Sequence, residues 1–173
     1  MEKMNVTEVL EYLDSVICDP SQGLPEEIFR FASSIVPMIN VDLLIRNKKG
    51  QTILIWREDE FYSPGWHIPG GIIRYKETAH ERIMAVAARE LGTKVTHVDA
   101  PVAINELIAK DPTWRIRGHF ISLLYECQLL EPPKTKRAEK SHRPQPGEWD
   151  WHATCPDNLY EAQDIYKKYI GNR

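Results

Sequence analysis

Apolar and polar residues follow a helical period at the start of the chain. Segment 5–17 has apolar residues at positions 6, 9, 10, 13, 16 and 17, which predicts an amphipathic helix. Asn5 and Glu8 have the spacing of a capping pair for that helix. Segment 24–36 predicts a second helix, because Pro25 suits a first helical turn and two acids follow it. We therefore expect residues 1–36 to form an N-terminal helical extension.

After Pro37 the pattern changes to short runs rich in β-branched and aromatic residues. Runs 38–46 and 52–57, separated by the polar segment 47–51, predict a β-hairpin. Helical spacing returns over 76–91, and the segment 131–147 is rich in proline and basic residues, which predicts a long loop. The other predicted elements are strands near 66–71, 93–98, 102–108, 119–129 and 148–153, and a closing helix over 157–171. This alternation predicts a mixed α/β domain over residues 37–173.

Composition narrows the class of protein. The chain has 173 residues, 42% of them hydrophobic, which is enough for a core without disulfides. Its net charge of −3 gives no basic field for nucleic acid. Three widely spaced cysteines disfavour a zinc site, and neither a signal peptide nor a membrane-spanning run is visible. We expect a cytoplasmic protein with no nucleic-acid or membrane partner.

One stretch, residues 65–92, carries candidate chemistry. Two adjacent glycines precede the predicted helix, so the backbone there can approach a ligand closely, and the free amides favour anions. The acids are Glu77, Glu81 and Glu90. The first two share a helix face, whereas Glu90 lies about two and a half turns further on and faces roughly the other way. From the pattern alone, a surface helix with solvated acids is the favoured interpretation.

The same stretch resembles the Nudix box, Gx5Ex7REUxEExGU, where U is aliphatic. The matching positions are Gly71, Glu77, Ala87, Glu90 and Gly92. Four positions depart from the box, because Ala85-Val86 replaces its Arg-Glu, Arg89 replaces an acid and Thr93 replaces the last aliphatic residue. The resemblance implies a Nudix-type α/β/α sandwich with a mixed β-sheet.

A similar departure is typical of the GDP-mannose mannosyl hydrolases, which cleave at the sugar carbon. The resemblance to that branch extends over residues 37–152. It implies that Asp42 binds the sugar, that Arg57 holds the diphosphate, and that Mg²⁺, or alternatively Mn²⁺, binds to Gly70, Glu90 and Gln145. It also implies a homodimer.

The branch's catalytic base is a histidine directly after the metal-binding glutamine, and here that position is Pro146. We name Glu106 and His119 as the candidate bases. Glu106 is flanked by apolar residues, so we expect a poorly solvated carboxyl group with a raised pKa. His119 titrates near neutral pH in its ordinary state. Four of the proposed site residues also have a purely structural interpretation. Asp42 could face solvent on its strand, Arg57 could cap the hairpin, Gln145 could lie in a mobile linker, and His119 could lie in the core.

The function expected from this resemblance is Mg²⁺-dependent hydrolysis of a nucleoside diphosphate sugar, releasing sugar and nucleoside diphosphate. Arg57 would clamp the leaving group, and Glu106 or His119 would activate water. Two alternatives stay open. One is an atypical Nudix enzyme that cleaves the pyrophosphate bond. The other is a nucleotide-sugar binding protein that has lost hydrolysis.

Overall fold

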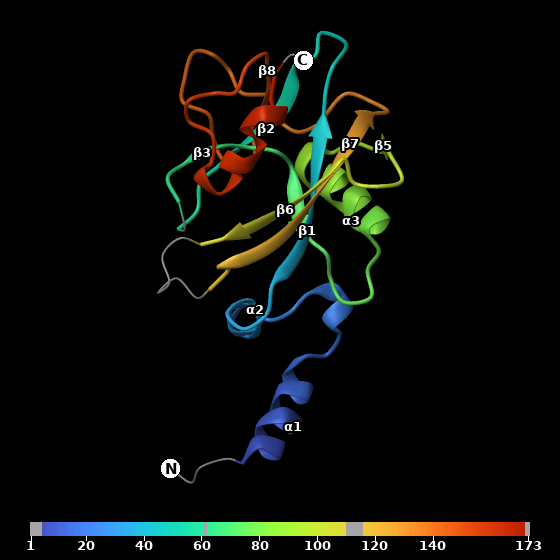
Figure 1. Cartoon of the computed structure of the whole chain (residues 1–173), viewed down its shortest axis with the longest axis vertical. Helices are drawn as coiled ribbons and strands as arrows, with labels where there is room; N and C mark the ends of the chain where they lie inside the picture. The colour runs from blue at the N-terminus through green and yellow to red at the C-terminus, as the bar shows by residue number, and fades with distance from the viewer. Residues whose placement is uncertain (1–4, 61, 110–115, 172–173) are drawn as a thin grey trace.

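Two β-sheets form the centre of the fold, and the helices lie around them (Figure 1). The computed structural model describes residues 5–60, 62–109 and 116–171. The larger sheet has the strand order β4-β1-β7-β5, with β6 also paired to β7, and the smaller sheet has the order β3-β2-β8. Strands β1 and β7 run parallel, while the other pairs are antiparallel. The strands are β1 Met38–Ile45, β2 Thr52–Arg57, β3 Gly65–His67, β4 Gly70–Ile72, β5 Val95–His97, β6 Ala103–Ile108, β7 His119–Leu129 and β8 Trp149–His152. The predicted mixed α/β class is confirmed.

The predicted hairpin between β1 and β2 is wrong beyond its turn. Only the bridge between Arg46 and Thr52 joins the two strands, which then separate into different sheets. The turn itself forms, because the Asn47 side chain accepts hydrogen bonds from the amides of Lys49 and Gln51. The last five residues of β1, Val41–Ile45, and the first five of β2, Thr52–Trp56, are buried. A two-stranded hairpin cannot cover both faces of such strands, so each strand joins a separate sheet with its own neighbours.

The two faces of β1 contribute to two different cores. Val41, Leu43 and Ile45 pack with β2 residues and with the helix α3 Ala79–Val86. On the opposite face, Leu44 packs with Trp56, Trp66 and the C-terminal Tyr166. The predicted closing helix is a 3-10 helix, η3 Glu161–Tyr169. Because its Tyr166 packs with Leu44, η3 covers the face of the sheet opposite to α3.

The helix after the two glycines changes its winding near its end. Thr78 and Glu81 form a capping box at the start of α3, so the helix begins later than the predicted residue 76. From Ala87 to Leu91 the chain forms a π-helix, η2, and Gly92 ends it with a φ of 62°. The π-helix carries Arg89 and Glu90. Such wider turns are frequent at functional sites.

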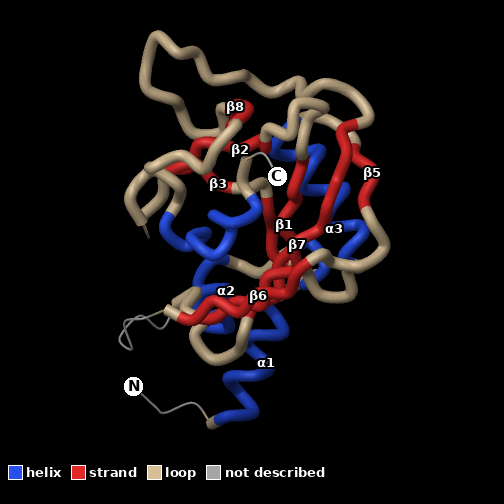
Figure 2. The backbone as a smooth tube through the Cα atoms, turned by 45° about the horizontal axis from the view of Figure 1, so that its top comes forward, coloured by secondary structure: helices blue, strands red, loops and turns tan. Residues whose placement is uncertain are grey.

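The predicted capping pair is present at the start of the N-terminal helix, and apolar side chains of that helix are exposed. The helix α1 Val6–Val16 has the Asn5–Glu8 capping box, and a short 3-10 turn, η1 Pro20–Gln22, leads to α2 Glu26–Ser33. Figures 1 and 2 show α1 projecting away from the sheets, with α2 below the start of β1. No residue of α1 is buried, and Val6 and Leu10 are 76% and 56% exposed. No helix in the described part of the chain is long and apolar enough to cross a membrane.

The exposed stripe on α1 supports the proposal of a homodimer in which a second copy covers it. We expect the chain to sediment at twice its mass of 20.1 kDa at tens of micromolar. Leu10→Glu should give the monomer, because it places a charge in the stripe. Ser15→Glu, on the opposite side of α1, is the matched control and should stay dimeric. A wild-type particle of 20.1 kDa would contradict the proposal.

Candidate active site

A cleft of about 1500 Å³ runs along β1, β4, the π-helix and the C-terminal segment. This volume exceeds the range of about 300–1,000 Å³ that is common for ligand pockets, so a ligand as large as a nucleotide sugar has room. Five of the residues expected at the site line the cleft, namely Asp42, Arg57, Gly70, Glu90 and Glu106. Gln145 and His119 are not among its lining residues, although Pro146, next to Gln145, is.

The carboxylate of Asp42 lies buried at the wall of the cleft and is held by protein donors. It is 2% exposed. Its Oδ2 accepts hydrogen bonds from Asn40 at 2.7 Å, from Tyr166 at 2.5 Å and from the Ser122 hydroxyl, while Gln163 approaches Oδ1 at 3.5 Å. Burial raises the pKa of Asp42 to about 6, and the Ser122 and Tyr166 hydrogen bonds oppose that rise. The alternative of a solvent-facing Asp42 is therefore wrong.

Residues 70 and 71 are glycines because side chains of β1 and α3 lie very close to the backbone of β4. A Cβ at Gly70 would collide with the Asp42 carboxylate. A Cβ at Gly71 would lie 2.9 Å from a methyl group of Val86 on α3. Glycine at both positions lets β4 fit between β1 and the helix. This packing sets the positions of the Gly70 amide and carbonyl at the cleft.

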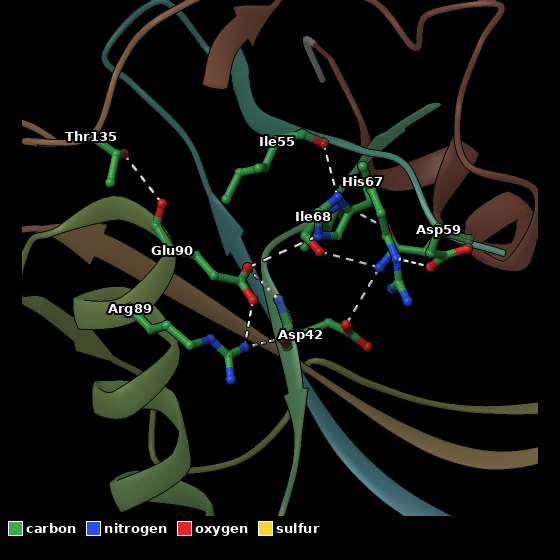
Figure 3. Close-up of polar contacts among 11 residues, drawn as sticks. Asp42, Ile55, Asp59, His67, Ile68, Arg89, Glu90 and Thr135 are labelled. Carbon is green, nitrogen blue, oxygen red and sulfur yellow. Dashed lines mark hydrogen bonds and ion pairs between the residues drawn. The ribbon is translucent and has the colours of Figure 1, made fainter. Parts of the chain in front are cut away.

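Glu90 and Gly70 come together as expected, and the Arg89 guanidinium contacts both. Figure 3 shows Arg89 beside Glu90. The Gly70 amide donates to Glu90 Oε2 at 3.3 Å. Arg89 Nη2 donates to Glu90 Oε1 at 2.6 Å and to the Gly70 carbonyl at 3.3 Å. The main-chain carbonyl of Glu90 accepts from Thr135 at 3.2 Å, which ties the loop 131–147 to the π-helix.

These residues do not fit a divalent metal ion at the expected position. The side chain of Gln145 is turned to the carbonyl of Arg143, at 3.2 Å, and no contact with Gly70 or Glu90 is found within the described residues. Across the same residues, no group of three or more His, Cys, Asp or Glu side chains is placed to hold a metal. The cation of Arg89 already contacts the two remaining donors, Gly70 O and the Glu90 carboxylate. A divalent ion would have to displace it.

Glu77 of the box and Glu81, which is not a box position, serve the local fold. Glu77 accepts hydrogen bonds from Arg82 Nε at 2.7 Å and from the Arg74 amide at 2.8 Å. Glu81 caps α3 through Thr78. Glu90 contacts Gly70 and Arg89 instead, and no contact between Glu90 and either of these acids is found within the described residues.

Arg57 is held at the cleft by a short polar chain. Its Nε lies 2.5 Å from Asp59, and the hydroxyl of Tyr160 donates to the same carboxylate at 2.7 Å. The guanidinium lies 4.6 Å from the centre of the Tyr160 ring. Burial raises the pKa of Tyr160, so its hydroxyl stays a donor at neutral pH. Arg57 is therefore oriented before any ligand binds, rather than acting as the cap of a hairpin.

His67 is a residue of this site to which the sequence assigned no role. It is buried between β2 and the π-helix, its Nδ1 lies 2.8 Å from the Ile55 carbonyl, and its Nε2 lies 3.9 Å from Glu90 (Figure 3). Burial lowers the pKa of His67, so the ring is neutral at neutral pH. The neutral tautomer then donates from Nδ1 to Ile55 and presents the Nε2 lone pair toward Glu90. Its place next to the glycine turn was the only signal in the sequence.

Glu106 and His119 form a pair on the edge formed by β6 and β7. His119 Nε2 lies 3.2 Å from Glu106 Oε1. The expectation of a poorly solvated Glu106 is wrong, because its side chain is 61% exposed. The reason is the alternation of β6, which places the flanking Asn105 and Leu107 inward and Glu106 outward. His119 is half-buried and does not belong to either core cluster.

Comparisons with known proteins agree on one family. The family model of the NUDIX domain matches residues 36–156. The low-salt glycan biosynthesis protein Agl8 of Haloferax volcanii is 35% identical over 77 residues, which are 44% of this chain and 49% of that protein. The chain thus matches about half the length of this relative.

Solved structures share the fold at low sequence identity. A possible asymmetric diadenosine tetraphosphate hydrolase from Jonesia denitrificans has a TM-score of 0.59 at 20% identity, covering 78% of this chain and 92% of its own. A MutT NUDIX hydrolase from Burkholderia pseudomallei has a TM-score of 0.58 at 18% identity, covering 78% and 98%. These similarities confirm the predicted fold.

The buried Asp42 predicts a pH dependence of stability. Its folded pKa of about 6 lies above the ordinary 3.8, so the stability that its neutral form contributes is complete below 3.8. That contribution is lost as the pH rises through about 6, and it amounts to about 3 kcal/mol at most. Asp42→Asn carries no titrating group. Urea unfolding from pH 4 to pH 8 should show the variant gaining stability relative to wild type by this amount, and a constant difference would contradict the assignment.

Proposed function

The chain belongs to the NUDIX domain family of hydrolases, and from this premise we propose that it hydrolyses a nucleoside diphosphate sugar. The observation that carries the proposal is that two arginines, Arg57 and Arg89, line one cleft from opposite elements. Arg57 comes from the end of β2 and Arg89 from the π-helix. Guanidinium groups bind phosphate oxygens in a bidentate way, so such a pair suits a diphosphate.

Polar and aromatic groups beside the arginines suit the rest of such a ligand. Among the described residues, Asp42 Oδ1 accepts one long hydrogen bond, from Gln163 at 3.5 Å, so this oxygen has capacity for a sugar hydroxyl. Tyr75 lines the same cleft, is 58% exposed and offers a ring face for a base. The Agl8 relative is named for glycan biosynthesis, which supports a sugar-containing ligand over other nucleotides.

In the proposed reaction, water attacks the anomeric carbon and nucleoside diphosphate leaves. Arg57 and Arg89 would stabilise the charge that grows on the leaving diphosphate. Glu106 lines the cleft and is the candidate base, with His119 at 3.2 Å as its partner. Nudix hydrolases generally use divalent metal ions such as Mg²⁺. Because the residues here do not fit such an ion beside Arg89, these steps are assigned to side chains alone.

Cleavage of a pyrophosphate bond is the second candidate. The Jonesia neighbour is described as a possible diadenosine tetraphosphate hydrolase. In this chain, cleavage of a pyrophosphate bond would use the same two arginines. Loss of hydrolysis is the third, because two of the box acids are replaced here, Val86 and Arg89 standing at their positions. The three candidates differ in their products.

Product analysis separates these candidates. The purified chain is incubated with GDP-mannose and with UDP-glucose, with and without Mg²⁺, and products are identified by NMR and anion-exchange chromatography. Free sugar with nucleoside diphosphate is the expected result. Sugar phosphate with nucleoside monophosphate would replace the proposal by pyrophosphate cleavage. Binding without turnover would make the chain a binding protein.

Arg57 should contribute to this activity through a charge-assisted contact with the diphosphate. Arg57→Ala should lower kcat/KM by about 10- to 100-fold, because such a contact is worth roughly 1.5–3 kcal/mol. Arg137→Ala removes an arginine that does not line the cleft and pairs with Asp150. This control should keep the wild-type rate. Equal rates for Arg57→Ala and wild type would remove Arg57 from the site.

The identity of the base is tested by the dependence of rate on pH. If Glu106 accepts the proton, Glu106→Gln should lower kcat by about a hundredfold or more and remove the acidic limb of the profile. His119→Gln should shift that limb while keeping most of the rate, because His119 contacts Glu106 and does not line the cleft. Near-wild-type profiles for both variants would show that neither residue is the base.

A further inference from the structure

The position of Arg89 has a consequence for the metal requirement of this site. We infer that Arg89 is the resident cation of the cleft: it replaces a divalent ion between Gly70 and Glu90 and binds the phosphate of the ligand directly. The chain then binds a nucleoside diphosphate group without metal. The part about the ligand rests on the proposed function, whereas the part about the metal does not.

The contacts of Arg89 are those that a metal ion would make. A single nitrogen, Nη2, reaches both Glu90 Oε1 at 2.6 Å and Gly70 O at 3.3 Å. The Glu90 side chain is 17% exposed, so its charge is poorly hydrated and needs a cation. Arg89 supplies that cation from the adjacent position of the π-helix. The pair is neutral, so little attraction for a second cation remains.

The charges around the pair reinforce this effect. Family members with the full box have an acid at the position of Arg89, so the replacement changes the local charge by two units. Glu77, the first acid of the box, is bound by Arg82 at 2.6 Å. A divalent ion at Gly70 and Glu90 would lie beside the positively charged guanidinium of Arg89. The carboxylate of Glu77 would not be available to this ion, because it is already paired with Arg82.

The geometry of Arg89 also leaves room for a ligand. Its side chain is 56% exposed and lines the cleft. Both of its hydrogen bonds in the described part of the chain use Nη2. The N–H groups of Nη1 and Nε donate no hydrogen bond among the described residues, and they can donate to phosphate oxygens while Nη2 keeps its contacts. Lysine has a single nitrogen and no such additional donors at separate positions, so the arrangement depends on arginine.

Direct titration with Mn²⁺, without nucleotide, tests the metal part by electron paramagnetic resonance. Wild type should bind Mn²⁺ at least about tenfold more weakly than Arg89→Glu, which restores an acid beside Glu90. Arg89→Gln frees Glu90 without adding charge and should fall between them. Arg137→Glu makes the same charge reversal outside the cleft and should match wild type. Equal Mn²⁺ affinity of wild type and both Arg89 variants would overturn the inference.

The ligand part is measured by calorimetry with GDP in excess EDTA. Wild type should bind GDP under these conditions, and Arg89→Gln should lose about tenfold or more in affinity. Arg89→Lys keeps the charge but not the separate Nη1 and Nε donors, and it should lose part of the affinity for GDP. GDP binding only after Mn²⁺ is added would overturn this part. If product analysis finds no hydrolysis but the Mn²⁺ series holds, the proposed function fails alone.

Discussion

The arrangement of the cleft depends on one buried negative charge, the carboxylate of Asp42. Burying a carboxylate is costly unless donors surround it, and here the donors come from three separate segments. Asn40 belongs to the same strand, Ser122 to the neighbouring strand β7, and Tyr166 and Gln163 to the C-terminal η3. The same carboxylate leaves no space for a Cβ at Gly70. It therefore fixes both the C-terminal cover of the sheet and the backbone that faces Glu90.

From Gly70 the constraint passes to the π-helix. The Gly70 amide and carbonyl meet Glu90 and Arg89, so the two side chains are held on the cleft side of the helix end. The replacement of a box acid by Arg89 changes the chemistry of the cleft without changing the fold. The positive charge that a bound metal ion would supply comes instead from a side chain of the protein. Arg57, oriented by Asp59 and Tyr160, provides the second positive charge.

Local signals predicted the fold well, and long-range contacts set its limits. The Asn5–Glu8 capping box and the strands follow from spacing within a few residues. The predicted hairpin was wrong because β1 and β2 are buried strands that pair with different neighbours. Such long-range pairing cannot be read from the residues of the two strands alone. Asp42 could be suspected from its polarity in an apolar run, but its partners Ser122 and Tyr166 lie 80 and 124 positions away. Glu106 was misjudged because apolar flanking residues point to the opposite face of a strand.

We infer that a side-chain cation, Arg89, holds the position between Gly70 and Glu90. This is best tested by a crystal structure of the wild-type chain grown with GDP and Mn²⁺, with anomalous data collected at the manganese edge. We expect Arg89 Nη2 to keep its contacts with Gly70 O and Glu90, phosphate oxygens to lie on Arg57 and Arg89, and no anomalous peak to lie between Gly70 O and Glu90. An anomalous peak bonded to both of those groups, with Arg89 turned away, would contradict this inference.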